Sequence, residues 1–325
     1  MSQKVNPWDG METPMPPAFS TKIVDSYSSN NFMWIKDCNG NIGLALSFND
    51  SVEGRFGVPN LQNLEIAVQS DKKTLTFLLK EEGSLRQFRI FCEDCMESVN
   101  KLSTADSAHI LKKLELVVDK WVGLFGSKKK KTLSKSSELG LIGELLVMKN
   151  VFMAVISPAD SLLSWHGPKR HEQDFSFNSF LVEVKCQLAS KDKIFTISSF
   201  DQLDDISGQI YISHVGLSPA LGSSIDSFSL PSLVDEVIIY LSKDNYAIDT
   251  FLGLLEIAGY KHNGNTLFDH YVESFMNFFK VTDSFPKIKK KDVHKAIDKC
   301  SYRINATMLA NWQIPKNQLL EEIIR

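Results

Sequence analysis

Residues 171–187, HEQDFSFNSFLVEVKCQ, are typical of a tight β-hairpin, yet its apolar strands carry Asp174 and Glu183 at positions that could face each other. The polar pair Asn178-Ser179 separates two apolar runs and predicts a two-residue hairpin turn. In that register Asp174 stands opposite Glu183, with Cβ atoms about 5 Å apart. Two carboxylates at this distance repel each other, and a divalent cation such as Mg²⁺, which prefers oxygen ligands, would offset the repulsion. The alternative is a solvated sheet edge on which a neighbouring lysine neutralises Glu183.

The second strand of this hairpin has one polar and one apolar face. Side chains alternate between the two faces of a strand, so Glu183, Lys185 and Gln187 share one face, and the residues between them share the other. A carboxylate, an amine and an amide would then form a polar row beside the expected metal ion. We interpret the apolar face as core and the polar face as the chemical one.

A third carboxylate comes from the segment 138–155, ELGLIGELLVMKNVFMAV, which predicts an apolar helix. The helical neighbours of Glu144 are small or apolar, so burial of its carboxylate is costly unless it is paired or bound to a metal ion. The alternative is a residue at the helix edge that reaches water. Gly140 and Gly143 are each unfavourable by about 1 kcal/mol relative to Ala, and they indicate a helix that approaches the sheet closely.

The segments after the hairpin complete a core. Residues 193–199, KIFTISS, and 208–218, GQIYISHVGLS, predict strands, and residues 200–207 between them predict a helical turn. The order helix, β-hairpin, strand, helical turn, strand predicts a mixed α/β fold.

The N-terminal part is expected to be β-rich. Residues 31–48 contain two apolar runs around Asn39-Gly40, which is a strong hairpin signal. Residues 94–125 change to a helical period, and 126–137, GSKKKKTLSKSS, predict a linker. Further strands are predicted at 63–69, 74–82 and 85–93.

The C-terminal part is expected to be an α/β extension. Helices are predicted at 232–242 and 246–260, a polar basic stretch at 278–288, and a last strand at 301–312. We therefore divide the chain into an N-terminal β-rich module with a helix (1–127), a core (133–220) and the extension (221–325).

The composition is that of an ordinary globular protein. The 325 residues carry a net charge of -3, so any nucleic-acid site must be a local basic patch. No secretory signal or membrane helix is recognised, so we expect a cytoplasmic protein without a membrane partner. Five cysteines argue against a disulfide framework, and Cys92-x-x-Cys95 lacks the second ligand pair of a zinc site.

The order of Glu144, Asp174 and Glu183-Val184-Lys185 resembles the PD-(D/E)XK nuclease superfamily, in which a helix glutamate precedes an aspartate and a Glu-x-Lys triplet on adjacent strands. Gln173 stands where the motif often has proline. The segments LGLIGELLVMKN, WHGPKRHEQDFSF, LVEVKCQ, DQLDDISGQIYISHVGLS and DSFPKI are similar to the bacterial family DUF4420. This resemblance covers most of the chain beyond about residue 130, and the β-rich module fits it more weakly.

The resemblance implies a restriction-endonuclease-like core and a metal-dependent deoxyribonuclease in a restriction or phage-defence system. It assigns Mg²⁺, or Mn²⁺, to Asp174, Glu183, the Val184 carbonyl and Glu144. Lys185 would orient the attacking water or stabilise negative charge. The alternative is a non-catalytic DNA-binding or scaffold subunit of a defence complex. Expected partners are DNA, other defence subunits and a second copy of the chain.

Four further residues are candidates for nucleic-acid contact. Lys169, Arg170 and His171 precede the aspartate and would clamp a phosphate, with a solvated loop as the alternative. Gln187 would contact substrate or close the polar row. The runs KKKK at 128–131 and KIKKKDVHK at 287–295 would flank the cleft, or simply face water.

Overall fold

The computed structural model describes most of the chain. The described residues are 6–24, 31–48, 61, 63–69, 73–80, 84–100, 102, 107–125, 133–169, 171–203, 208–262, 264 and 267–324. They form two compact units, one of residues 1–131 with 252–257, and one of residues 132–251 with 258–325. We call them the N-terminal and the C-terminal unit.

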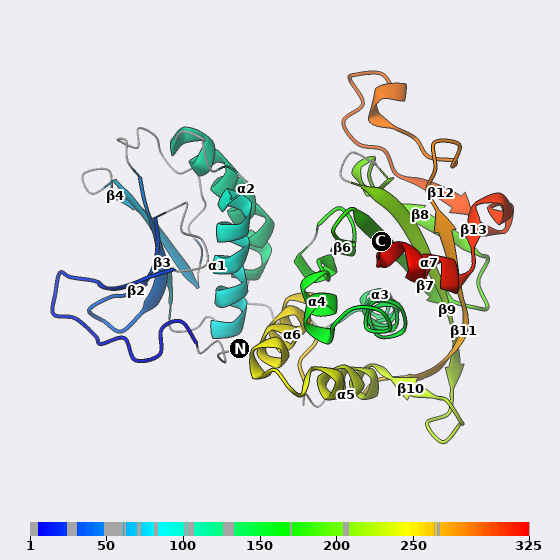
Figure 1. The fold of residues 1–325 in the computed structure, drawn as a ribbon, viewed down its shortest axis with the longest axis horizontal. Helices are drawn as coiled ribbons and strands as arrows, with labels where there is room; N and C mark the ends of the chain where they lie inside the picture. Colours follow the sequence, from blue (N-terminus) through cyan, green and yellow to red (C-terminus); the bar gives the residue numbers. More distant parts are fainter. Residues whose placement is uncertain are drawn as a thin grey trace. The chain divides into compact units, whose positions relative to one another are not determined.

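The N-terminal unit contains an antiparallel sheet and two helices (Figure 1). Its strand order is β1-β2-β3-β5-β4. The Asn39-Gly40 hairpin is confirmed: the Asp37 carboxylate accepts the main-chain N–H groups of Asn39 and Asn41, and Gly40 has a φ of 85°. The elements are β1 Ser20–Ile23, β2 Phe32–Lys36, β3 Ile42–Ser47, β4 Leu64–Gln69, β5 Thr74–Leu79, α1 Leu85–Asn100 and α2 Ser107–Phe125.

The strand predicted at 85–93 is wrong, because these residues open helix α1. Their apolar run also fits a helix face, on which Phe88, Phe91 and Cys95 are fully buried. Cys92 is buried as well, and burial raises the pKa of both α1 thiols well above the usual range. A buried, protonated thiol is a poor zinc ligand, so this pair is part of the core.

The C-terminal unit is built on a six-stranded sheet. Its strand order is β10-β11-β9-β7-β6, with β13 paired to β11, and a separate ribbon joins β12 to β8. The strands are β6 Phe175–Phe177, β7 Phe180–Leu188, β8 Ile194–Ile197, β9 Gln209–Ala220, β10 Phe228–Ser229, β11 His270–Lys280, β12 Tyr302–Asn305 and β13 Gln313–Ile314. The helices are α3 Lys135–Val147, α4 Pro158–Leu163, α5 Leu230–Leu241 and α7 Lys316–Ile323. Helix α6, Asn245–Ala258, also belongs to this unit, except for residues 252–257, which are part of the N-terminal unit.

Helix α3 packs against β7 on one face of this sheet (Figure 1). On the other face, the β8–β12 ribbon closes an apolar cluster to which β7, β9 and β11 also contribute. Strands β7 and β9 are parallel, whereas β6 and β11 run antiparallel to their neighbours. The unit is therefore a mixed α/β structure, as the order of predicted elements indicates.

Two C-terminal predictions need correction. Residues 278–280, which were assigned to a polar stretch, end the long strand β11, whose pairing with β9 shifts register between Glu273 and Phe275. That irregularity breaks the alternation by which a strand is recognised. The strand predicted at 301–312 is limited to β12, which pairs with β8, and 3₁₀ turns follow it.

The two glycines of α3 have different surroundings. A Cβ on Gly143 would lie 2.6 Å from the Cys186 Cβ and 3.3 Å from a Val184 methyl, so Gly143 allows the close approach to β7 that the sequence predicts. A Cβ on Gly140 would meet nothing within 4 Å, so the same expectation is wrong for Gly140.

We expect Gly143→Ala to destabilise the protein by roughly 1–3 kcal/mol, because the added methyl overpacks the helix–sheet contact. Gly140→Ala is the matched control, and it should stabilise the protein by roughly 0.4–1 kcal/mol, because Ala reduces the entropy of the unfolded chain. Urea unfolding measures both free energies. Equal effects of the two substitutions would contradict this account of the contact.

No helix within the described ranges has the length and apolar character needed to cross a membrane.

Candidate active site

The hairpin of β6 and β7 has the predicted register. Phe175 pairs with Val182 and Phe177 with Phe180, around a turn in which Asn178 has a φ of 53°. The ladder ends at Phe175, so Asp174 does not pair with Glu183 as the sequence predicted. The chain bends there, and the Asp174 carbonyl accepts the N–H groups of His166 and Gly167 instead.

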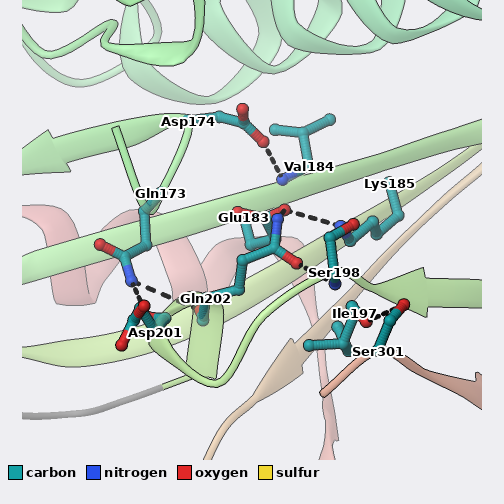
Figure 2. A network of polar contacts seen from close by, with 10 residues as sticks. All are labelled: Gln173, Asp174, Glu183, Val184, Lys185, Ile197, Ser198, Asp201, Gln202 and Ser301. Carbon is teal, nitrogen blue, oxygen red and sulfur yellow. Dashed lines mark hydrogen bonds and ion pairs between the residues drawn. The ribbon is translucent and has the colours of Figure 1, made fainter. Parts of the chain in front are cut away.

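The bend directs the Asp174 side chain toward the part of the β7 edge that β6 does not pair with. Its Oδ2 atom accepts the main-chain N–H of Val184 at 2.7 Å (Figure 2). The N–H and C=O of one strand residue point to the same edge, so the Val184 carbonyl lies on the Asp174 side of β7, beyond the last β6 pair. Asp174 and the Val184 carbonyl therefore present oxygen atoms to one region.

Glu144 reaches the same region from helix α3. Its Oε2 atom accepts the indole N–H of the buried Trp165 at 2.7 Å. A Cβ on Gly167 would overlap Glu144 Oε2 and lie 3.1 Å from Asp174 Oδ1. The two carboxylates thus meet over Gly167, at a position where any side chain would intrude.

Glu183 projects from β7 as the most buried member of the polar row, with 3% of its surface exposed. Its Oε1 atom accepts the Lys185 ammonium at 2.7 Å and the Gln202 amide at 2.8 Å (Figure 2). Gln202 is itself fixed, because its Oε1 accepts the Ser198 N–H at 2.7 Å. Glu183 Oε2 is buried and has no hydrogen-bond partner among the residues that the structure describes.

Burial raises the pKa of all three carboxyl groups. Burial raises the Asp174 pKa to about 6, although the hydrogen bond from the Val184 N–H and the Lys185 charge both lower it. The Glu183 pKa rises to about 8 through burial and the Asp174 charge, and Lys185 opposes the rise. The Glu144 pKa lies well above its usual range, because of burial and then the Asp174 charge. Each group is costly to ionise without a cation.

Gln187 ends the polar row and is held by other protein groups. Its amide donates to the Asp192 carbonyl at 2.8 Å, and its Oε1 lies 3.2 Å from Nε2 of His214. His214 is fully buried on β9 opposite Lys185, and burial lowers its pKa to about 4. A neutral His214 therefore supports Gln187, which in turn holds the turn that follows β7.

The structure describes some of the basic residues that were candidates for nucleic-acid contact, and others lie outside the described residues. Lys169 ends a 3₁₀ turn at Gly167–Lys169, and His171 stacks on His166 with ring centroids 4.9 Å apart. Arg170 and the run 128–131 lie outside the described residues. The 287–295 run lies in the segment between β11 and β12, where it includes a 3₁₀ turn at Lys290–Asp292.

Three residues of this site were missed in the sequence. Trp165 and Gly167 shape the Glu144–Asp174 pair, and Gln202 holds Glu183. The Trp-x-Gly at 165–167, upstream of Asp174, is a local signal, since tryptophan donates a hydrogen bond and glycine permits close approach. Gln202 gave no such signal, because its contact with Glu183 depends on how the segment after β8 folds back toward β7.

The donor set fits a hard divalent cation. Three carboxylates and the Val184 carbonyl are oxygen ligands of the kind Mg²⁺ prefers, and one buried Glu183 oxygen lacks a partner. In the arrangement that the described residues adopt, no three His, Cys, Asp or Glu side chains are grouped closely enough to hold an ion. Binding of a metal ion by these carboxylates would therefore need their side chains to move closer together.

The chain matches the family DUF4420, described as "Putative PD-(D/E)XK family member", over residues 5–307. Because this match spans most of the chain, the protein belongs to that family, which points to nuclease activity. The match includes the N-terminal unit, in which the sequence showed only a weaker resemblance to the family. No curated protein and no solved structure matches the chain.

Proposed function

We propose that this protein is a metal-dependent endonuclease that hydrolyses phosphodiester bonds in DNA. The observation that carries the proposal is the buried Glu183 carboxylate. One of its oxygens binds Lys185, and the other has no partner within the described part of the chain. Structural ion pairs seldom leave a buried carboxylate oxygen unsatisfied, whereas perturbed carboxylates beside a lysine are typical of catalytic sites.

The proposed ligands for Mg²⁺ or Mn²⁺ are Asp174, Glu183 and the Val184 carbonyl, with Glu144 contacting the ion directly or through water. A bound ion would polarise the scissile phosphate and lower the pKa of a bound water molecule. In the same proposal, residues 133–220 form a restriction-endonuclease-like catalytic core, flanked by the β-rich module (1–127) and the extension (221–325).

The side chains around the ligands have separate roles. Lys185 supplies a positive charge that orients the attacking water or stabilises the negative charge that develops on the phosphate. Trp165 and Gln202 hold Glu144 and Glu183 in place through single hydrogen bonds. These residues position the carboxylates and do not contact the substrate.

The cellular setting is part of the proposal. The family resemblance supports a cytoplasmic protein of a bacterial restriction or phage-defence system. It would act together with other subunits or with a second copy of the same chain. A different class remains open: a non-catalytic DNA-binding or scaffold subunit that keeps the nuclease core. The net charge of -3 favours dependence on a partner for DNA capture, whereas the intact set of Glu144, Asp174, Glu183 and Lys185 favours the enzyme.

Incubation of the pure protein with supercoiled plasmid separates the two functions. The nuclease proposal predicts nicked or linear DNA with Mg²⁺ or Mn²⁺ and none with EDTA. DNA binding without cleavage under every metal condition would favour the non-catalytic subunit.

A further inference from the structure

The polar row of β7 ends at a hollow on the surface of the C-terminal unit. The hollow has a volume of about 550 Å³. It is lined by Gln187, Ser190, Lys191, Asp192, Ile194 and Arg303. Gln187 lies two residues beyond Lys185 on the same strand face, at a distance of about 6.6 Å along β7. The hollow is therefore adjacent to the proposed catalytic lysine.

Two elements bring cations to this hollow. Lys191 lies in the turn between β7 and β8, which the Gln187 amide holds through its bonds to the Lys191 and Asp192 carbonyls. Arg303 lies on β12, where it pairs with Thr196 of β8. Its neighbour Ile304 is buried in the apolar cluster, so Arg303 projects from the outer face of the ribbon.

The charge of the hollow is positive. Lys191 and Arg303 are exposed, and neither forms an ion pair within the part of the chain that the structure describes. Asp192 contributes the one carboxylate of the lining. Two unpaired cations at a concave surface attract an anion, and the guanidinium of Arg303 suits a phosphate in particular.

The segment before β12 also carries several cations. It projects from the β8–β12 ribbon as the orange loop of Figure 1. Four of its lysines are exposed, namely Lys290, Lys291, Lys295 and Lys299. The segment leads directly into the strand that carries Arg303, so the lysines of the loop and Arg303 belong to one stretch of chain.

We propose that the hollow is a phosphate subsite for the polynucleotide strand that leaves the catalytic row. Lys191 and Arg303 contact backbone phosphates, Gln187 fixes the turn that carries Lys191, and the lysines of the loop extend the track. This inference rests on the proposed nuclease function, and it selects the 287–295 run as a nucleic-acid contact.

The test is binding of the full-length protein to a fluorescein-labelled 20-base-pair DNA duplex in EDTA, measured by anisotropy over a salt series. The variant Lys191→Ala/Arg303→Ala removes both cations of the hollow. Lys243→Ala/Lys261→Ala is the matched control, because it removes two exposed lysines elsewhere in the same unit. The third variant, Asp192→Asn, removes the carboxylate.

We expect the hollow variant to bind roughly tenfold more weakly, with a salt slope flattened by about 0.9 for each lost phosphate contact. The control should bind like wild type, and Asp192→Asn should bind more tightly than wild type. This gain could not come from a damaged fold. If Lys191→Ala/Arg303→Ala and Asp192→Asn both bind DNA with the affinity and salt slope of the wild type, the subsite is overturned and the nuclease proposal still stands. Failure of the wild-type protein to bind any duplex would overturn both.

Discussion

Glu183→Gln and Asp174→Asn should each lower the rate of metal-dependent DNA cleavage by roughly a thousandfold. Each substitution keeps the size of the side chain and removes one of the negative charges that would bind the ion. The fold should survive, because both carboxyl groups are costly to ionise in the metal-free protein. Plasmid cleavage rates and thermal unfolding of each variant measure the two effects.

Glu172→Gln is the matched control for these variants. Glu172 lies two residues before Asp174, in the same loop, and it is exposed. Its substitution should leave the cleavage rate unchanged. Purified Asp174→Asn protein that cleaves at the wild-type rate would show that the ligands are assigned wrongly.

The second large effect is on stability in the absence of metal. The folded protein holds the Glu183 proton up to about pH 8, whereas the unfolded chain releases it near pH 4.5. Unfolding therefore releases a proton between these values, and the stability of the wild type falls as the pH rises through this window. We expect Glu183→Gln to exceed wild type by roughly 3–5 kcal/mol at pH 9, and the advantage should vanish near pH 4.5.

Urea unfolding in EDTA at several pH values measures this difference. Asp174→Asn provides an internal comparison, because the Asp174 pKa is about 6. The stability advantage of this variant over the wild type should therefore stop growing above about pH 6. A Glu183→Gln advantage that does not change between pH 5 and pH 9 would show that Glu183 is ionised in the fold at neutral pH.

The sequence predicted the parts of this site that depend on local rules. The Asn178-Ser179 turn set the register of β6 and β7, and alternation then placed Glu183, Lys185 and Gln187 on one face. Extending the ladder to Asp174 failed, because pairing rules do not reveal where a chain leaves the sheet.

The rest depended on tertiary structure. The pattern of residues 85–93 fits both a strand and a helix. These residues form a helix because its apolar face is buried in the core. Strand β11 was missed because its register shift interrupts alternation. The contact of Gln202 with Glu183 joins segments 19 residues apart, and no local sequence pattern predicts that these side chains meet.

Binding of a divalent cation by Asp174, Glu183 and the Val184 carbonyl is measured most directly by an anomalous difference map from crystals of the full-length protein grown with Mn²⁺. We predict one peak within bonding distance of both carboxylates and the carbonyl, with a Glu183 oxygen turned toward it, and no such peak in Asp174→Asn crystals. A wild-type protein that cleaves DNA with Mn²⁺ but shows no peak at this position would contradict the claim.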